Sequence, residues 1–218
     1  MSQEQEHKDG QDAVDPKREV RSEVFELVKM VALFLIIFWG LKSFVIGGYE
    51  VQGPSMYPTL EDKERILVMK LPHRISQLPI FKGFTAIDPG DIVVFDSQIE
   101  ENKRYVKRVI AVGPKRTGPR PVNASETDDT PAPGSKKVVF DHGAIFVDNH
   151  RVEESYLQPE ERKSLDFHEA YVEPGEYYVL GDHRSVSRDS RSFDAVDDSQ
   201  IVGHAVFRFW PLSRIGLL

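Results

Sequence analysis

Short segments rich in β-branched and aromatic residues dominate the sequence after Gly48. Turn-forming pieces such as DPGD, DHG and EPGE separate them. No long stretch of this region repeats its apolar residues at intervals near 3.6, so long helices are not predicted there. The pattern predicts a mainly β domain, a sandwich or barrel, over residues 49–218. The β-rich segments are YEVQG, RILVMK, DIVVFDS, RYVKRVIAV, KKVVFD, AIFVDN, EYYVLGD and IVGHAVFRFW.

Two other regions have compositions that do not favour a packed structure. Residues 113–136 (GPKRTGPRPVNASETDDTPAPGSK) are rich in Pro, Gly, Ser and Thr and predict a flexible excursion from the β domain. Residues 1–23 are polar and lack Phe, Tyr and Trp, which predicts a disordered tail.

A single strongly apolar segment, residues 24–48 (VFELVKMVALFLIIFWGLKSFVIGG), separates the tail from the β domain. A helix of this length would span about 37 Å at ~1.5 Å per residue. An apolar bilayer core is about 30 Å thick, so the segment predicts one transmembrane anchor helix. Basic residues cluster before its core, which predicts a cytoplasmic N-terminus and a β domain outside the cell membrane. These residues are Lys17, Arg18, Arg21 and Lys29.

Three other interpretations of residues 24–48 compete with the anchor. A cleaved signal peptide fits the short uninterrupted core from Met30 to Leu41, but no A-x-A-like site follows Gly48. The length and near-continuous apolarity disfavour a buried helix of the β domain. An amphipathic helix lying on the membrane surface is disfavoured because the core has no polar face.

The composition excludes several functional classes. The absence of cysteine rules out disulfides, thiolate metal sites and cysteine nucleophiles. The net charge of −7 and the scattered basic residues argue against a nucleic-acid partner. The histidines lack metal-ligand spacing, and neither a metal nor an organic cofactor is predicted.

Residues 53–60 (GPSMYPTL) contain a serine in an unusual setting. Ser55 is not in a G-x-S-x-G elbow, because Tyr57 stands where the last glycine would be. A nucleophilic serine needs a neighbouring base, and no histidine motif supplies one. Ser55 is therefore either an ordinary turn residue or a nucleophile whose base is not histidine.

Two further stretches group reactive side chains. In RYVKRVIAVG (104–113), a strand would place Tyr105 and Lys107 on one face and Val106 and Arg108 on the other. The second stretch, YYVLGDHRSVSRDSR (177–191), runs from a strand into a loop dense in Asp, Ser and Arg.

These three stretches, in this order behind an apolar segment, resemble the type I signal peptidases of bacteria, membrane-bound Ser/Lys proteases. GPSMYPTL resembles the S-M-x-P-T-L box of that family, YVKRVIAVG its lysine box, and GDHRSVSRDSR its G-D-N-R-x-x-S-x-D-S-R box. DPGDIVVF and IVGHAVFRFWPLSRIG resemble further family segments. The resemblance covers residues 24–218 apart from the excursion. It implies a signal-peptidase-like β-sheet or barrel catalytic domain behind one N-terminal transmembrane helix.

The resemblance implies that Ser55 is the nucleophile and Lys107 its general base. A free lysine has a pKa of ~10.4, but burial among apolar groups lowers that value by disfavouring the ammonium. Ser187 matches the family serine that hydrogen-bonds and orients the lysine. The residues implied to support this loop are Arg108, Asp182, Asp189 and Arg191.

Two positions depart from the family pattern. Some members place an oxyanion-binding serine two residues before the nucleophile. Here that position is Gly53, which leaves the Ser55 N–H as the implied donor. His183 stands where the family has asparagine, and the resemblance assigns this position no proton transfer.

The implied substrates are signal-peptide-bearing preproteins with small residues at the first and third positions before the cut. The seven residues from Gly48 to Ser55 reach at most about 24 Å, which keeps the nucleophile near the membrane lipid. Sec or Tat export machinery is expected nearby. The resemblance implies a first pocket shaped by Met56, Leu60 and Tyr105. It implies another shaped by Tyr49, Val51, Ile66 and Val106.

Two rival functions remain open at this point. A self-cleaving SOS-type Ser/Lys protease predicts a DNA-binding domain and no anchor, the reverse of what residues 1–48 offer. A membrane-tethered, non-catalytic β module that binds exported chains is the other rival. The loss of Ser55 or Lys107 would have indicated such a non-catalytic module, and both residues are present.

Overall fold

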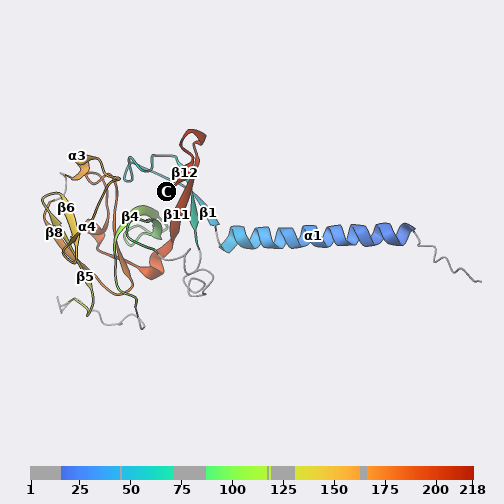
Figure 1. The fold of residues 1–218 in the computed structure, drawn as a ribbon, viewed down its shortest axis with the longest axis horizontal. Helices are drawn as coiled ribbons and strands as arrows, with labels where there is room; N and C mark the ends of the chain where they lie inside the picture. Colours follow the sequence, from blue (N-terminus) through green and yellow to red (C-terminus); the bar gives the residue numbers. More distant parts are fainter. Residues whose placement is uncertain (1–15, 45, 71–86, 117, 119–130, 163–165) are drawn as a thin grey trace, which may run out of the picture. The chain divides into compact units, whose positions relative to one another are not determined.

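The computed structural model describes residues 16–44, 46–70, 87–116, 118, 131–162 and 166–218 (Figure 1). Two compact units make up the chain, residues 1–43 and residues 44–218, and each is described by itself. In the second unit the described residues form antiparallel sheets connected by turns and four short helices. The predicted mainly β fold is confirmed.

The first unit is the helix α1 (Pro16–Phe44). It begins inside the predicted tail, because Pro16 suits a first helical position and good helix formers follow it. Its large apolar side chains between Val24 and Trp39 are exposed. Within the described residues, no helix combines the length and apolarity needed to cross a membrane.

The helix ends at Phe44, before the predicted end of the anchor at Gly48, because the residues after it form a strand. Residues 46–48 belong to β1 (Ile46–Glu50), where they pair with residues 67–69 of β2 (Arg65–Met69). The two consecutive glycines, Gly47 and Gly48, disfavour helix continuation, and the ladder to β2 satisfies their backbone groups.

The larger sheet carries the strands that hold the serine and lysine boxes. Its order is β1 (Ile46–Glu50), β2 (Arg65–Met69), β11 (Ile201–Trp210), β3 (Ile92–Asp96), β4 (Arg104–Val112), β9 (Glu176–Leu180) and β10 (Val196–Asp197), with β12 (Gly216–Leu217) paired to β11. The smaller sheet has the order β7 (His150–Arg151), β6 (Ala144–Val147), β5 (Lys136–Asp141) and β8 (His168–Val172). The short helices are α3 (Pro159–Arg162), α4 (Ser190–Phe193), η1 (Asp198–Gln200) and η2 (Leu212–Arg214).

Each β-rich segment of the sequence contains a strand, and the strands that the pattern misses are short or polar. Among these, β8 carries His168 and Glu169 and forms an edge of the smaller sheet, where polar side chains are tolerated. The other missed strands, β7, β10 and β12, have only two residues each.

Three buried apolar clusters fill the second unit. One lies under the smaller sheet, around Phe140 and Tyr178. Another lies between β3, β4, β9 and α4, around Phe95 and Phe193. The third holds Met56 and Leu60 of the serine box among residues of β2, β3 and β11. This last cluster fixes the loop that carries Ser55 from beneath.

The ends of the predicted excursion are tied to the larger sheet. Gly113 N–H donates to the Glu176 carbonyl (2.8 Å), and the Pro114 carbonyl accepts from Gly175 N–H (2.9 Å). Arg116 forms an ion pair with Asp197. The centre of the excursion, residues 117 and 119–130, lies outside the described residues, as do residues 1–15 of the predicted tail.

Candidate active site

The loop between β1 and β2 carries Ser55. At its base, Val51 N–H donates to the Glu64 carbonyl and Lys63 N–H donates to the Val51 carbonyl, both at 2.8 Å. Met56 and Leu60 are fully buried beneath it. The loop is therefore closed by hydrogen bonds at its base and anchored by two core side chains, which fixes the Ser55 backbone.

Lys107 of β4 lies directly against Ser55. Its Nζ donates to Ser55 Oγ at 2.9 Å and to the Val106 carbonyl at 3.0 Å. The Lys107 amine also lies 5.5 Å from the centre of the Tyr105 ring, on the same face of the strand. Only 3% of the Lys107 residue is exposed.

Burial lowers the pKa of Lys107 to about 8, because a charged ammonium loses its hydration in this setting. The carboxylates of Asp189 and Asp182 act in the opposite direction, since negative charge favours the ammonium. Desolvation is the larger effect. The amine is consequently a much better base near neutral pH than a solvated lysine.

The loop after β9 packs tightly against the Ser55 loop. His183 N–H donates to the Ser55 carbonyl at 3.1 Å, and His183 Nδ1 lies 3.3 Å from the Pro54 carbonyl oxygen. At Gly181 a Cβ would clash with Ser187 and crowd the Ser55 carbonyl oxygen, so glycine alone permits this approach.

Ser187 does not make the hydrogen bond that the resemblance implies. Its Oγ is buried and has no hydrogen-bond partner in the part of the chain that the structure describes. The Ser187 backbone N–H donates to the His183 carbonyl at 3.0 Å, which places the residue inside the same loop. The Lys107 amine is instead held by Ser55 and a main-chain carbonyl.

Two arginine–carboxylate pairs hold this loop. Arg108 contacts both oxygens of Asp182, at 2.9 and 2.7 Å, and Asp182 is completely buried. Arg191 likewise contacts both oxygens of Asp189, at 2.8 and 2.9 Å. Asp189 also accepts from Gly181 N–H at 3.0 Å. The four residues predicted to support the loop are thus brought together in two bidentate pairs.

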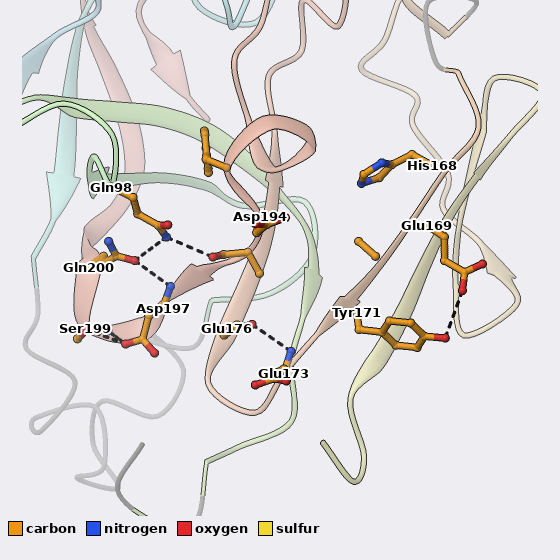
Figure 2. A pocket seen from close by; sticks show the side chains of 13 residues that line it. Gln98, His168, Glu169, Tyr171, Glu173, Glu176, Asp194, Asp197, Ser199 and Gln200 are labelled. Carbon is orange, nitrogen blue, oxygen red and sulfur yellow. Dashed lines mark hydrogen bonds between the residues drawn. The ribbon is translucent and has the colours of Figure 1, made fainter. Parts of the chain in front are cut away.

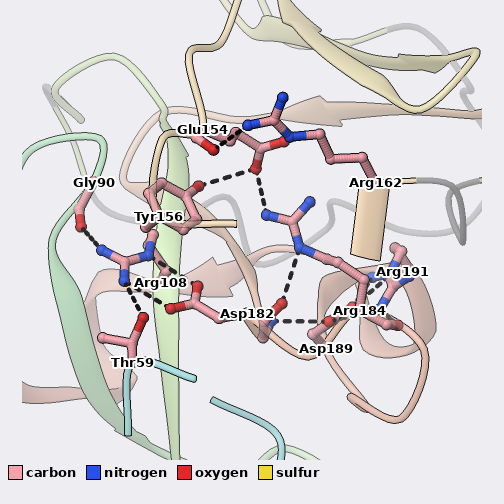
Figure 3. A network of polar contacts seen from close by, with 11 residues as sticks. Thr59, Gly90, Arg108, Glu154, Tyr156, Arg162, Asp182, Arg184, Asp189 and Arg191 are labelled. Carbon is pink, nitrogen blue, oxygen red and sulfur yellow. Dashed lines mark hydrogen bonds and ion pairs between the residues drawn. The ribbon is translucent and has the colours of Figure 1, made fainter. Parts of the chain in front are cut away.

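The network continues into residues that the sequence did not single out (Figure 3). Arg184 is 1% exposed, pairs with Glu154 and donates to the Gly181 carbonyl at 2.9 Å. Tyr156 donates to Glu154 at 2.9 Å, and its ring stacks on the Arg108 guanidinium with 3.9 Å between Cζ and the ring centre. The segment between β7 and β8 of the smaller sheet therefore supports the loop after β9.

A second polar group holds the opposite side of the Ser55 loop. Arg208 of β11 donates to the Thr59 carbonyl at 2.7 Å and to Glu64 at 3.2 Å. Arg214 donates to the Pro58 carbonyl at 3.1 Å and pairs with the same buried Glu64. Both arginines lie in IVGHAVFRFWPLSRIG, which resembles a family segment, but that likeness does not predict these contacts, because their partners lie about 150 positions away in the sequence.

A cavity of about 110 Å³ opens beside Ser55. Five of the predicted pocket residues line it together, although the resemblance divides them between two pockets: Tyr49, Val51, Ile66, Tyr105 and Val106. Met56 and Leu60 do not line it, because both side chains point into the core. Both residues pack beneath the Ser55 loop, and their role in the first pocket stays a prediction.

A larger and more polar hollow of about 790 Å³ lies between β8, β9 and β10 (Figure 2). Ser199 is the serine that lines this hollow, and its hydroxyl donates to Asp197 at 2.6 Å. No lysine lines it, and its histidine, His168, packs against Phe140. Within the described residues, no group of three or more potential ligands could hold a metal ion. The Ser–Lys contact is thus found beside the smaller cavity.

Comparison with known proteins gives the family. The model of the signal peptidase family, peptidase S26, matches residues 24–118 and 132–210. The chain belongs to this family. It is 30% identical to signal peptidase IB of Staphylococcus aureus strain COL over 211 residues, which cover 89% of this chain and 94% of that protein. The resemblance carried by the three boxes is confirmed, and the chain is a signal peptidase I-type enzyme.

Two further relatives are similar. Signal peptidase I of Bacillus caldolyticus is 33% identical over 186 residues, covering 80% of this chain and 85% of that protein. The crystal structure of a signal peptidase I from Enterococcus faecalis V583 aligns with a TM-score of 0.41 at 22% identity, over 55% of this chain and 97% of that one.

Replacing Asp182 by alanine is expected to destabilise the second unit by about 3–5 kcal/mol, because it leaves the Arg108 guanidinium buried and without its bidentate partner. Urea denaturation of the purified protein in detergent measures the free energy of unfolding. Asp141→Ala is the matched control, since that carboxylate is exposed and should cost no more than about 1 kcal/mol. Equal losses in both variants would contradict a supporting role for the pair.

Proposed function

We propose that this signal peptidase family member removes signal peptides from exported preproteins, with Ser55 as nucleophile and Lys107 as general base. The observation that carries the proposal is the 2.9 Å contact between Ser55 Oγ and the buried Lys107 amine. A nucleophile and its base within hydrogen-bonding reach are the geometry that acyl transfer needs.

In the first step, Ser55 Oγ attacks the carbonyl carbon of the scissile peptide while neutral Lys107 accepts the hydroxyl proton. The resulting oxyanion is stabilised by hydrogen bonds, for which the Ser55 N–H is the implied donor. Gly53 supplies no side-chain donor, and its φ of +86° disfavours a residue that would. Lys107 then delivers its proton to the leaving amine, the C–N bond breaks, and an ester between Ser55 and the signal peptide remains.

In the second step, neutral Lys107 accepts a proton from a water molecule that attacks the ester carbonyl. Collapse of the new tetrahedral intermediate breaks the C–O bond, and the proton returns to Ser55 Oγ. The signal peptide leaves with a new carboxylate. Burial of the amine lowers its pKa and so raises the neutral fraction with which each step begins.

The free strand edges beside Ser55 fit an extended substrate. Among the described strands, β1 pairs only with β2, and β4 pairs with β9 only from Arg108 onwards. Residues 104–107 and the end of β1 thus leave backbone groups open on either side of the cavity. A preprotein could bind here by adding a strand, with small A-x-A side chains entering the 110 Å³ cavity.

We also propose that α1 tethers the enzyme to the cell membrane, with a cytoplasmic N-terminus and the catalytic unit outside. The exposed apolar side chains between Val24 and Trp39 support tethering, since water disfavours such a surface. The basic residues before them support the orientation. Membrane lipid and the Sec or Tat machinery that delivers preproteins would then be its surroundings.

Replacing Lys107 by alanine is expected to lower the rate of preprotein cleavage at least about 100-fold, because Ser55 loses its base. The measurement is cleavage of a preprotein with an A-x-A site by purified enzyme in detergent. Lys137→Ala, which removes an exposed lysine of β5, should cut like the unchanged enzyme. Cleavage by a folded Lys107→Ala variant at the wild-type rate would remove Lys107 from the mechanism and make His183 the next candidate base.

The cleavage rate is expected to rise with pH between pH 7 and pH 9. With a Lys107 pKa of about 8, roughly a tenth of the amine is neutral at pH 7 and about nine tenths at pH 9. Because only the neutral amine accepts a proton, kcat/KM should increase roughly tenfold over this range. A profile that stays flat between these values would contradict the proposed base.

Deleting residues 1–44 is expected to release the catalytic unit from membranes, because the exposed apolar helix is then absent. Fractionation of expressing cells measures how each form sediments, with a high-salt wash to remove ionic attachment. The full-length chain should stay in the membrane fraction after the wash. A full-length chain that appears in the soluble fraction would contradict tethering.

A further inference from the structure

His183, in the loop after β9, contacts both peptide units that flank Ser55. Its backbone N–H donates to the Ser55 carbonyl at 3.1 Å, and its ring nitrogen Nδ1 lies 3.3 Å from the Pro54 carbonyl oxygen. The backbone contact needs no particular side chain, but the ring contact does. A carbonyl oxygen only accepts hydrogen bonds, so Nδ1 carries a proton in this contact and donates it.

Further contacts hold the His183 ring on its other side. Nε2 lies 3.5 Å from a carboxylate oxygen of Glu161 in α3, a contact that becomes an ion pair when the ring is protonated. The other carboxylate oxygen of Glu161 accepts from Ser185 N–H at 3.2 Å. The centre of the Tyr57 ring lies 6.1 Å from the centre of the His183 ring. The imidazole is therefore held between α3 and the Ser55 loop.

The Pro54 carbonyl belongs to the peptide unit whose N–H is the implied oxyanion donor. The Pro54–Ser55 bond is trans, and in a planar trans unit the carbonyl and the N–H point in opposite directions. A donor that fixes the direction of the Pro54 carbonyl thus fixes the direction of the Ser55 N–H. Tyr57 N–H also donates to this carbonyl, at 3.0 Å. The turn and the His183 ring together leave this peptide unit little freedom to rotate.

The direction of the Ser55 N–H matters because the oxyanion exists only briefly. A donor stabilises it best when the donor already points to the place where the charge appears. A hydrogen bond to the carbonyl of a peptide unit also polarises that unit, which strengthens its N–H as a donor. Gly53 supplies no side-chain donor, so the Ser55 N–H carries a larger share of the stabilisation.

We propose that His183 is a positioning residue: through the Pro54 carbonyl, its ring holds the Ser55 N–H toward the oxyanion of the reacting peptide. This role rests on the proposed function, since it needs an oxyanion formed at Ser55. The asparagine of the family pattern fits the same role. Asparagine Nδ2 and histidine Nδ1 are each separated from Cα by two carbon atoms, so both can present an N–H to one acceptor.

A merely structural role for His183 makes different predictions. If the ring only packed against Tyr57, a ring without nitrogen would replace it and asparagine would not. If its loss moved Ser55 away from Lys107, the amine would gain water, and the pH dependence of cleavage would shift upward. A weakened oxyanion contact lowers kcat but leaves KM and this pH dependence unchanged.

The test compares His183→Phe, which keeps a ring but removes the donor, with His183→Asn, which keeps a donor but removes the ring. Each full-length variant is assayed in detergent on a preprotein with an A-x-A site, and kcat and KM are measured between pH 7 and pH 9. His142→Phe is the matched control, because the His142 side chain is 96% exposed in the turn between β5 and β6. Urea denaturation measures folding, and His183→Leu takes the place of His183→Phe if the latter does not fold.

His183→Phe is expected to lower kcat at pH 9 about tenfold, less than the roughly 100-fold cost of losing a direct oxyanion donor. Its KM should stay within about twofold of the wild-type value. The midpoint of its pH profile should stay near the Lys107 pKa of about 8. His183→Asn should keep kcat within about threefold, because the hydrogen bond is retained, and His142→Phe should cut like the wild type.

Three results would overturn this inference alone: normal cutting by His183→Phe, equal losses of kcat in His183→Phe and His183→Asn, or an upward shift of the pH midpoint in His183→Phe. Failure of the wild-type enzyme to cut the preprotein would overturn the proposed function as well.

Discussion

The burial of the Lys107 amine is the constraint on which the rest of the site depends. An ammonium removed from water is costly, and this cost lowers the pKa of Lys107 to about 8. The carboxylates of Asp182 and Asp189 oppose this effect, because both favour the charged amine. Each is bound by a bidentate arginine, Arg108 or Arg191, which compensates its negative charge. The two carboxylates therefore keep the hydrogen bonds that order the loop. The arginines reduce the electrostatic effect of these carboxylates on the Lys107 amine.

That arrangement explains why a second sheet accompanies the catalytic one. A buried ion pair is stable only where further hydrogen bonds satisfy its remaining donors and acceptors. Arg108 also donates to the Gly90 carbonyl at 2.8 Å and to Thr59 Oγ1 at 3.2 Å. The segment after β7 adds Tyr156, which covers the Arg108 guanidinium, and Glu154, which pairs with buried Arg184. Arg184 in turn contacts the carbonyl of Gly181, where a side chain would clash with the Ser55 carbonyl oxygen. The segment between β7 and β8 of the smaller sheet therefore helps to fix the position of the loop that packs against Ser55.

Much of the fold could be predicted from local pattern, whereas the site could be predicted only through the family boxes. Strands such as β4 and β11 are rich in β-branched and aromatic residues, but the polar edge strand β8 lacks this signal. The approach of Ser55 to Lys107 joins positions 52 residues apart, which no spacing rule predicts. The burial of Met56 and Leu60 could not be predicted, because tertiary packing, not loop sequence, decides which apolar residues of a loop enter the core. The isolated hydroxyl of Ser187 likewise depends on loop packing that its motif does not encode.

Irregular pairing along β11 is a second constraint on the geometry of the site. Register shifts interrupt its pairing with β2 at Ala205/Phe207 and its pairing with β3 at Ile201/Gly203. Such bulges bend a strand and increase its twist. At Gly203 a side chain would clash with the Met69 backbone, so the glycine allows β2 to close over β11. The same bend brings the Ser55 loop after β1 to Lys107 on β4. It also brings Tyr49 of β1 to Arg104 of β4, whose Nη1 donates to Tyr49 Oη at 3.0 Å beside the same cavity. A change in the bend therefore alters both the base contact and the size of the cavity.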